Sequence, residues 1–241
     1  MPAAEGSDDT ARREQVARNL TSVRARIDEA ARSVSRAPDD VTLVVVTKTW
    51  PASDVRLLAE LGITEVAENR DQEAAPKAAS VSDLRQLRWH FVGQLQSNKA
   101  RSVAHYASVV ESVDRPRLVS ALDRAAGLAG RTLLALVQVR LDAAAADRGG
   151  ASPDAVPAMA DLVAAAPHLE LGGVMAVAPL GEDPRPAFER LASVAARLRN
   201  DHPAATAISA GMSGDLEAAV ACGATHVRIG SAVLGGRPPV G

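Results

Sequence analysis

Strand-like and helix-like segments alternate along almost the whole chain, and this alternation limits the fold more than any other feature. A strict alternation of β and α segments predicts a parallel sheet with right-handed crossover connections. Eight repeats favour a closed (β/α)8 barrel of the TIM type, within the α/β class, over the alternative of an open Rossmann-like sheet. The expected strands are Leu43–Thr47, Glu65–Ala67, Arg88–Val92, Ser108–Val113, Leu133–Val139, Leu171–Val177, Ala205–Ser209 and His226–Ile229.

An additional helix is expected ahead of the first strand. Between Thr10 and Ser35, apolar residues recur at steps of three and four among many arginines, which predicts an amphipathic helix covering one end of the domain. Met1–Thr10 is expected to be a frayed tail and Asp142–Ser152 a surface loop. No composition break indicates a second domain, so we expect one domain over residues 1–241. Further expected helices are Ser53–Leu61, Pro116–Ala129, Pro153–Ala166 and Pro184–Arg199.

The composition indicates a partner that is a small molecule. Hydrophobic residues make up 47% and charged residues 23% of the 241 residues, with a formal net charge of -2. These values argue against a disordered chain, a membrane protein or a polyanion binder. Aromatic residues are only 2%, so the stacking surfaces used in RNA recognition are missing. Cys222 is the only cysteine, which excludes an internal disulfide and favours a reducing, cytoplasmic location.

Lysine is rare in this chain, and one lysine has a notable position. Lys48, Lys77 and Lys99 are the only lysines among 27 basic residues, and Lys48 comes directly after an apolar strand. In a barrel, the C-terminal strand ends form the functional face, where an apolar floor disfavours the charged form of an amine. An uncharged amine is what imine formation needs, so Lys48 is a candidate for Schiff-base chemistry. A lysine that snorkels from a strand end is the alternative.

Two glycine-containing turns follow the last two expected strands. The first is Ile208–Asp215, with the sequence ISAGMSGD, and the second is Val227–Ser231, with the sequence VRIGS. Barrels often hold a phosphate in the loops after strands seven and eight, using backbone N–H groups. Each turn alone could be an ordinary capping turn, with Ser213 as a helix cap and Gly230 as a tight-turn residue. Their combination with Lys48 argues against that alternative.

The lysine and the two turns together resemble the fold-type III proteins that use pyridoxal 5'-phosphate (PLP). More closely, the chain is similar to the pyridoxal-phosphate homeostasis (YggS/PROSC-like) family, which is related to the barrel domain of alanine racemase. The resemblance covers residues from about Asn19 to Arg237. The matching segments are Val46–Lys48, Ala67–Glu73, Trp89–Lys99, Gly172–Ala176 and Ser209–Arg237.

The resemblance implies a role for eight residues. Lys48 would carry PLP as a Schiff base, and Arg228 would face the pyridine nitrogen of the cofactor. Because an arginine does not readily give up a proton, that nitrogen stays unprotonated and the ring is a weaker electron sink, so transamination and decarboxylation are not expected. The expected phosphate ligands are Ser209, Gly211, Gly230 and Ser231, and the expected ring contacts are Asn69 and Met175.

The function implied by the resemblance is PLP binding for intracellular PLP homeostasis, without obligatory catalytic turnover. A racemase would need a second base, and the only tyrosine, Tyr106, lies outside these motifs, while no C-terminal β-domain is expected. A one-base PLP racemase that uses Lys48 alone stays open as an alternative, and a lysine Schiff-base aldolase is a further one. We expect a monomer with no nucleic-acid or membrane partner.

Two other polar positions lead to expectations about the barrel. His90 is expected to be a buried, hydrogen-bonded histidine that supports the fold, and the remaining histidines lack carboxylates at ligand spacing, so no metal site is expected. Glu68 is expected either to face the functional site or to pair with an arginine of a neighbouring loop. Asp215 and Glu217 are expected to be structural, because negative charge is favoured in the first turn of a helix.

Overall fold

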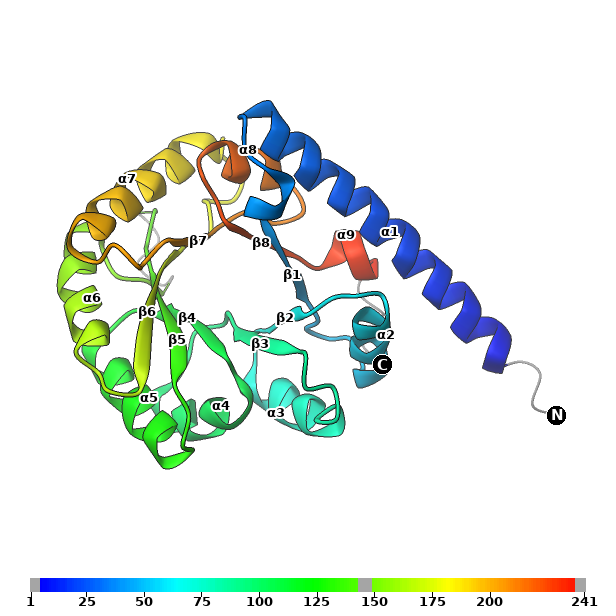
Figure 1. Cartoon of the computed structure of the whole chain (residues 1–241), viewed down its shortest axis with the longest axis horizontal. Helices are drawn as coiled ribbons and strands as arrows, with labels where there is room; N and C mark the ends of the chain where they lie inside the picture. The colour runs from blue at the N-terminus through cyan, green and yellow to red at the C-terminus, as the bar shows by residue number, and fades with distance from the viewer. Residues whose placement is uncertain (1–4, 143–148, 237–241) are drawn as a thin grey trace.

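In the computed structural model, eight parallel strands form a closed barrel in which β8 pairs with β1 (Figure 1). The structure describes residues 5–142 and 149–236. The closed barrel confirms the (β/α)8 prediction and excludes the open Rossmann-like sheet. The strands are β1 Thr42–Val46, β2 Glu65–Glu68, β3 Arg88–Phe91, β4 Val109–Val113, β5 Leu133–Gln138, β6 Leu169–Met175, β7 Ala207–Ser209 and β8 His226–Ile229.

The helices surround the barrel and differ from the expected ones mainly at their ends. The first helix begins at Glu5, so the expected tail is wrong for residues 5–10, while residues 1–4 lie outside the described residues. The expected helix Pro153–Ala166 is a short 3-10 helix, η3 Pro153–Ala155, followed by α6. The helices are α1 Glu5–Ser33, α2 Ala52–Glu60, α3 Asp71–Ser80, α4 Ala100–Tyr106, α5 Pro116–Leu128, α6 Val156–Ala164, α7 Arg185–Asp201, α8 Leu216–Ala221 and α9 Ser231–Leu234.

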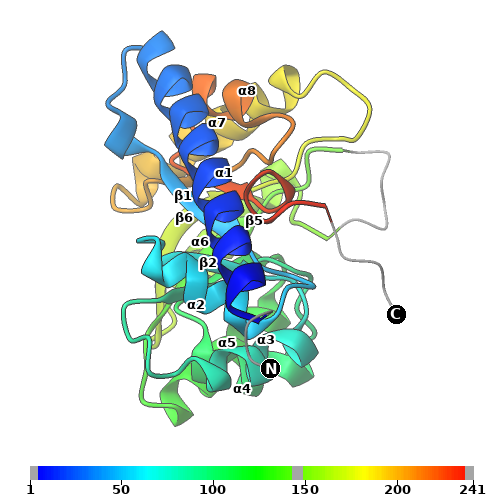
Figure 2. The ribbon, with the colours of Figure 1, turned by 90° about the vertical axis from the view of Figure 1, so that its right-hand side faces the viewer.

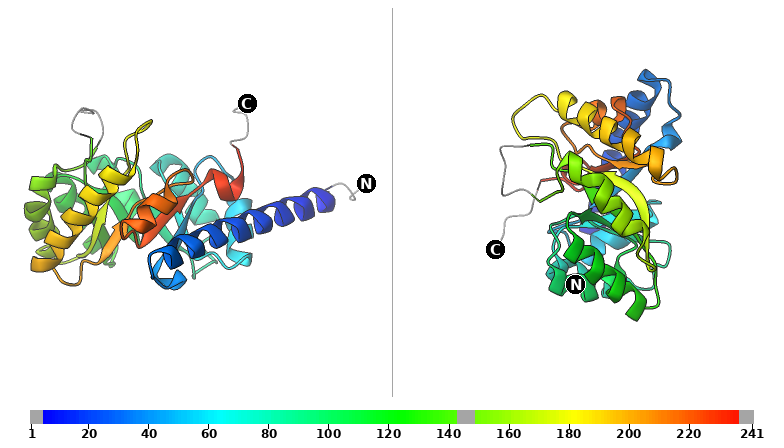
Figure 3. Two further views of the ribbon diagram at one scale, coloured as in Figure 1. Left: turned by 90° about the horizontal axis from the view of Figure 1, so that it is seen from above. Right: turned by 90° about the vertical axis from the view of Figure 1, so that its left-hand side faces the viewer.

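Helix α1 lies along the outside of the barrel, beside α8 and α9 (Figures 1 and 2). Its apolar residues Val16, Leu20, Val23 and Ile27 are all buried, as the helical spacing predicts. The view from above also shows α1 next to α9, the helix that follows the last strand (Figure 3). Among the described helices, none is both long and apolar enough to cross a membrane.

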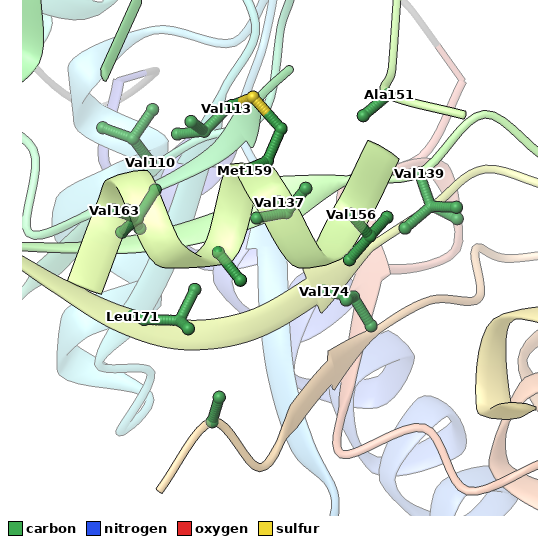
Figure 4. Close-up of a cluster of buried hydrophobic side chains, with 14 of the residues drawn as sticks. Val110, Val113, Val137, Val139, Ala151, Val156, Met159, Val163, Leu171 and Val174 are labelled. Carbon is green, nitrogen blue, oxygen red and sulfur yellow. The ribbon is translucent and has the colours of Figure 1, made fainter. Parts of the chain in front are cut away.

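The aliphatic core lies between the strands and the surrounding helices. On α6, Val156, Met159 and Val163 face the strands that carry Val137 and Val174 (Figure 4). Each side chain of this size contributes roughly 1.5–3 kcal/mol when fully buried, so aliphatic residues stabilise this shell without large aromatic side chains. The shell holds the strand ends, and therefore the residues that follow them, in fixed positions.

The inside of the barrel has an apolar part and a charged part. Val109, Leu136 and Met175 form a small apolar cluster there. Successive side chains of a strand point to opposite faces, so alternate residues of the other strands also enter the barrel. Several of these inward-pointing residues are charged, and they extend to the C-terminal mouth of the barrel.

Candidate functional site

Lys48 lies at the C-terminal mouth of the barrel, two residues after the end of β1. It is half-buried and lines a cavity of about 280 Å³ together with Arg228, Gly230 and Ser231. The structure thus brings together four of the eight site residues that the sequence analysis named. Among the described residues that line this cavity, Lys48 and Arg228 are basic and none is acidic. The cavity therefore suits a small anion-bearing ligand.

The loops after β7 and β8 meet at this cavity. Ser231 Oγ donates a hydrogen bond to Ser213 Oγ at 3.4 Å, so the two predicted phosphate loops touch through their hydroxyl groups. Ser213 lines the cavity, and the interpretation of Ser213 as a helix cap is wrong, because Asp215 is the residue at the start of α8. A Cβ atom at Gly230 would lie 3.2 Å from the Val46 carbonyl oxygen, so a side chain there would fill space between the loop and β1.

The other four expected site residues do not line this cavity. Ser209 and Met175 are buried inside the barrel, at 0% and 1% exposure. Gly211 has a φ of +94°, and a Cβ there would lie 2.7 Å from the Cβ of Ala219, so this glycine allows its loop to pack on α8. Asn69 lines a neighbouring cavity of about 520 Å³ at the end of β2. Their contacts with a cofactor stay predictions.

Arg228 is held from behind by buried hydrogen bonds. Its Nη1 donates to Ser209 Oγ at 2.6 Å, and its Nη2 donates to the Ala176 carbonyl oxygen at 2.8 Å. Ser209 in turn donates to Glu111 Oε2 at 2.6 Å, and this carboxylate oxygen lies 3.6 Å from Arg228 Nη1. Burial lowers the pKa of the Arg228 guanidinium, and the nearby Glu111 carboxylate opposes that shift.

The chain of contacts continues to the opposite end of the barrel. His90 is 2% exposed, with Nδ1 2.6 Å from Glu111 Oε1 and Nε2 2.7 Å from Glu65 Oε2. The prediction of a buried, hydrogen-bonded histidine is confirmed. A ring with a carboxylate at each nitrogen is best satisfied when both nitrogens carry protons. We call Glu65, His90, Glu111, Ser209 and Arg228 the interior cluster.

The charges of the interior cluster balance one another. Burial opposes ionisation of Glu111, but hydrogen bonds and charge from His90, with the charge of Arg228, lower the pKa of Glu111 to about 2. Burial likewise opposes the charge on His90, and the two carboxylates raise the pKa of His90 above its usual range. The pKa of Glu65 is lowered, because its bonds to His90 outweigh its own burial. Alternating charges therefore extend from Glu65 to the cavity.

A second buried cluster lies between β2 and α3, behind Lys48. Lys77 of α3 pairs with Glu68 of β2, and Lys77 Nζ also donates to the Thr47 carbonyl oxygen at 2.8 Å. Thr47 Oγ1 donates to Glu68 Oε1 at 2.7 Å. We call Thr47, Glu68 and Lys77 the β2–α3 cluster. It fixes the peptide group that immediately precedes Lys48, and the expectation that Glu68 pairs with an arginine is wrong.

The turn that carries Lys48 is strained on its other side. Thr49 has a φ of +70°, a value that a β-branched residue rarely adopts. Its N–H donates to Glu73 Oε2 at 3.2 Å, and the Trp50 N–H donates back to the Thr47 carbonyl oxygen at 3.1 Å. Lys48 therefore sits in a turn held at both ends by side chains of β2 and α3.

Comparison with known proteins places these features in a family. The model of the alanine racemase N-terminal domain matches residues 15–238. A pyridoxal phosphate homeostasis protein of Mycobacterium tuberculosis is 42% identical over 94% of this chain and 94% of its own. That of Pseudomonas aeruginosa is 41% identical over 92% of this chain and 96% of its own. The chain belongs to the pyridoxal phosphate homeostasis protein family. The resemblance seen in the sequence is thereby confirmed.

Solved structures support the same placement. PipY of Synechococcus elongatus, whose structure has PLP bound, is 35% identical to this homeostasis family member over 92% of this chain and 100% of its own, with a TM-score of 0.81. Alanine racemase of Clostridium difficile is 16% identical and matches with a TM-score of 0.70, over 94% of this chain and 58% of its own. The second likeness shows a shared barrel fold alone.

The contacts of three residues near the Lys48 cavity were missed by sequence reasoning. Glu111 lies inside the apolar strand Val109–Val113, and a lone carboxylate in such a run was the signal available. Lys77 was noted only as one of three lysines, although its place on α3 buries it against Glu68. Ser213 was considered only as a possible helix cap, although it lines the cavity. In each case the partner belongs to a different element, so only the fold could reveal it.

Tyr106 lies at the end of α4 in a groove next to α3, where its ring and that of Trp89 pack edge to face at a centroid distance of 6.3 Å. Burial raises the pKa of the Tyr106 hydroxyl. Within residues 5–142 and 149–236, there is no group of three or more His, Cys, Asp or Glu side chains that could hold a metal ion.

Proposed function

We propose that this protein binds PLP at the mouth of its barrel, with Lys48 supplying the amine, and that it serves PLP homeostasis without obligatory turnover. One observation carries the proposal: Lys48 shares a single cavity with Arg228 and with the two touching loops of Ser213 and Ser231. The family, and the PLP bound in the PipY structure, support it.

The residues at the cavity match the chemistry of this cofactor. PLP presents an aldehyde, which a primary amine can bind covalently, and a phosphate, which needs hydrogen-bond donors and positive charge. Lys48 supplies the amine, while Gly230, Ser231 and Ser213 supply backbone N–H and hydroxyl groups on the loops. Arg228 supplies a fixed positive charge. None of the described residues that line the cavity is acidic, so no carboxylate repels the phosphate there.

A charged guanidinium near the ring would leave the pyridine nitrogen without a proton donor. Electron withdrawal by the ring would then be weak, which disfavours transamination and decarboxylation of a bound amino acid. Tyr106, which could act as a second base, lies in the groove beside α3 instead of the Lys48 cavity. We therefore propose a carrier function instead of racemase or aldolase activity.

The test is covalent trapping of the cofactor. Purified protein is incubated with PLP, treated with borohydride and digested, and the modified peptide is identified by mass spectrometry. We expect a yellow protein whose reduced adduct is on Lys48, and no adduct at this peptide in Lys48→Ala. Lys99→Ala is the matched control, because Lys99 does not line the cavity, and it should trap PLP as the wild type does.

Two results would overturn the proposed function. Loss of optical purity of single-enantiomer amino acids at enzymatic rates, dependent on Lys48 and followed by chiral chromatography, would establish a one-base racemase. A colourless protein that is reduced only in the presence of a sugar phosphate would establish an aldolase.

We also propose a cytoplasmic location and a monomeric state. Cys222 is the only cysteine, as is common where thiols stay reduced. The most exposed large apolar side chains are Leu128 on α5 and Leu180 after β6, which lie on separate elements. Light scattering after size exclusion should give the mass of one chain, and a mass of two chains would contradict the monomer.

A further inference from the structure

The interior cluster reaches the cavity through Arg228, and no catalytic step has been assigned to its other charged members. We propose that Glu111, held by His90, is a positioning residue that fixes the orientation and charge of Arg228 at the PLP site. This inference rests on the proposed function. It assigns the buried carboxylate and imidazole a role in cofactor binding, beyond support of the barrel.

The guanidinium of Arg228 is fixed by two hydrogen bonds. Nη1 and Nη2 of Arg228 donate to two different acceptors, Ser209 Oγ and the Ala176 carbonyl oxygen. A guanidinium is planar and rigid, so two bonds from different nitrogens fix its plane. Arg228 is only 4% exposed, yet it lines the cavity. Its orientation there is therefore set by the groups behind it.

Ser209 links Glu111 to Arg228 through two hydrogen bonds of defined direction. Ser209 Oγ lies 2.6 Å from both Glu111 Oε2 and Arg228 Nη1. An ionised carboxylate only accepts, so Ser209 must donate to Glu111 and offer a lone pair to Arg228. A glutamine at position 111 can donate instead, which would allow the hydroxyl to turn and would weaken its bond to Arg228. The charge on Glu111 thus determines how Ser209 meets Arg228.

Glu111 is itself held in position by His90. His90 Nδ1 holds Glu111 Oε1 at 2.6 Å, which leaves Oε2 for Ser209. His90 is in turn held by Glu65, which also pairs with Arg88 at 3.1 Å. The His226 ring lies 6.3 Å from that of His90. The charged groups around His90 are therefore two carboxylates with Arg88 and Arg228 beyond them, and His226 is the neighbouring titratable ring.

The experiment compares three carboxylate-to-amide variants in the full chain. Glu111→Gln breaks the contact next to Arg228, and Glu65→Gln changes only the distant end of the cluster. Asp123→Asn is the control. Asp123 lies on the outer helix α5, where it pairs with His168, and it does not enter the barrel. For each protein, the visible PLP band, its pH profile and the dissociation constant for PLP are measured.

We expect Glu111→Gln to bind PLP roughly tenfold more weakly and to shift the visible band, since the carboxylate that accepts from Ser209 and pairs with the charge of Arg228 is lost. Glu65→Gln should change both readouts in the same direction by a smaller factor. Asp123→Asn should match the wild type. A merely structural cluster would lower stability in the variants without moving the band of the PLP that remains bound.

The outcomes separate this inference from the function it rests on. If the wild type traps no PLP on Lys48, the proposed function fails and the inference fails with it. If the wild type traps PLP but Glu111→Gln and Glu65→Gln keep its affinity and spectrum, only the inference is overturned. Should Glu111→Gln not fold, Glu65→Gln decides, with an unchanged band and affinity counting against the role of the cluster.

Discussion

Two buried ionic clusters stand behind the same cavity, and they differ in how completely their charges are paired. In the interior cluster both oxygens of Glu111 and both ring nitrogens of His90 have partners. In the β2–α3 cluster, Glu68 Oε2 has no hydrogen-bond partner among the described residues. The pKa shifts follow this difference. Partners lower the pKa of Glu111 to about 2, whereas burial raises that of Glu68 in spite of Lys77.

Burial alone therefore does not decide whether a carboxylate of this protein stays charged. Both side chains are 0% exposed, so the difference arises from the number and charge of their partners. The interior cluster holds a permanent charge behind Arg228. The β2–α3 cluster can take up a proton behind Lys48. Each side of the cavity therefore has a different electrostatic support.

The largest effect is expected when the fully paired cluster is broken. Glu111→Gln should lower the free energy of unfolding by about 3–5 kcal/mol, because it leaves Arg228 and His90 without their shared counter-charge. Urea unfolding at neutral pH measures the loss. A loss below about 1 kcal/mol would mean that the cluster contributes little to stability, as exposed ion pairs do.

The pH dependence should identify Glu111 as the source of that loss. A carboxylate with a lowered pKa stabilises the fold above its usual pKa and loses this contribution as the pH falls to about 2. His90 has a raised pKa, so it stabilises the fold at pH values below its usual pKa. This contribution is lost as the pH rises through the raised pKa. The difference in stability between wild type and Glu111→Gln should therefore be greatest near neutral pH.

The difference in unfolding free energy between wild type and Glu111→Gln should shrink by on the order of 3 kcal/mol between pH 7 and pH 2. Thermal unfolding of both proteins in a buffer series measures it. A difference that stays constant down to pH 3 would contradict the assignment of the low pKa to Glu111.

A smaller effect is expected in the β2–α3 cluster. Lys77→Met should lower the free energy of unfolding by about 1–3 kcal/mol. This is less than the usual loss when a buried ion pair is broken, because Glu68 can become neutral. Since the raised pKa of Glu68 favours its neutral form at low pH, the cost should be larger at pH 8 than at pH 5. Chemical unfolding at the two pH values tests this. The double variant Lys77→Met with Glu68→Gln is the control and should recover most of the loss.

The smallest effect concerns the strained turn beside Lys48. Thr49→Asn should raise the free energy of unfolding by about 0.5–1 kcal/mol, because asparagine tolerates a positive φ better than a β-branched residue. Differential scanning calorimetry would detect the rise. Thr21→Asn on the exposed face of α1 is the matched control and should change little. Destabilisation by Thr49→Asn alone would show that the threonine side chain, not the backbone, is needed there.

Much of the framework could be predicted from sequence because it depends on local patterns. Every strand has bounds within two residues of those expected, since short apolar runs between helix-like segments are a direct signal. Lys48 and the turn with Gly230 follow strands whose ends must meet at one mouth, so their closeness also follows from topology. The early start of α1 was missed because the small, acidic residues before Thr10 carry no apolar stripe.

The chain by itself determined that eight strands would alternate with helices and that a lysine would follow the first of them, because hydrophobic periodicity and neighbouring residues encode both. Only the tertiary structure decided which charges are paired. Glu111, His90 and Arg228 come from β4, β3 and β8, and they meet because the barrel closes. Contacts inside a closed barrel depend on strand register and on the inward face, which no local pattern specifies.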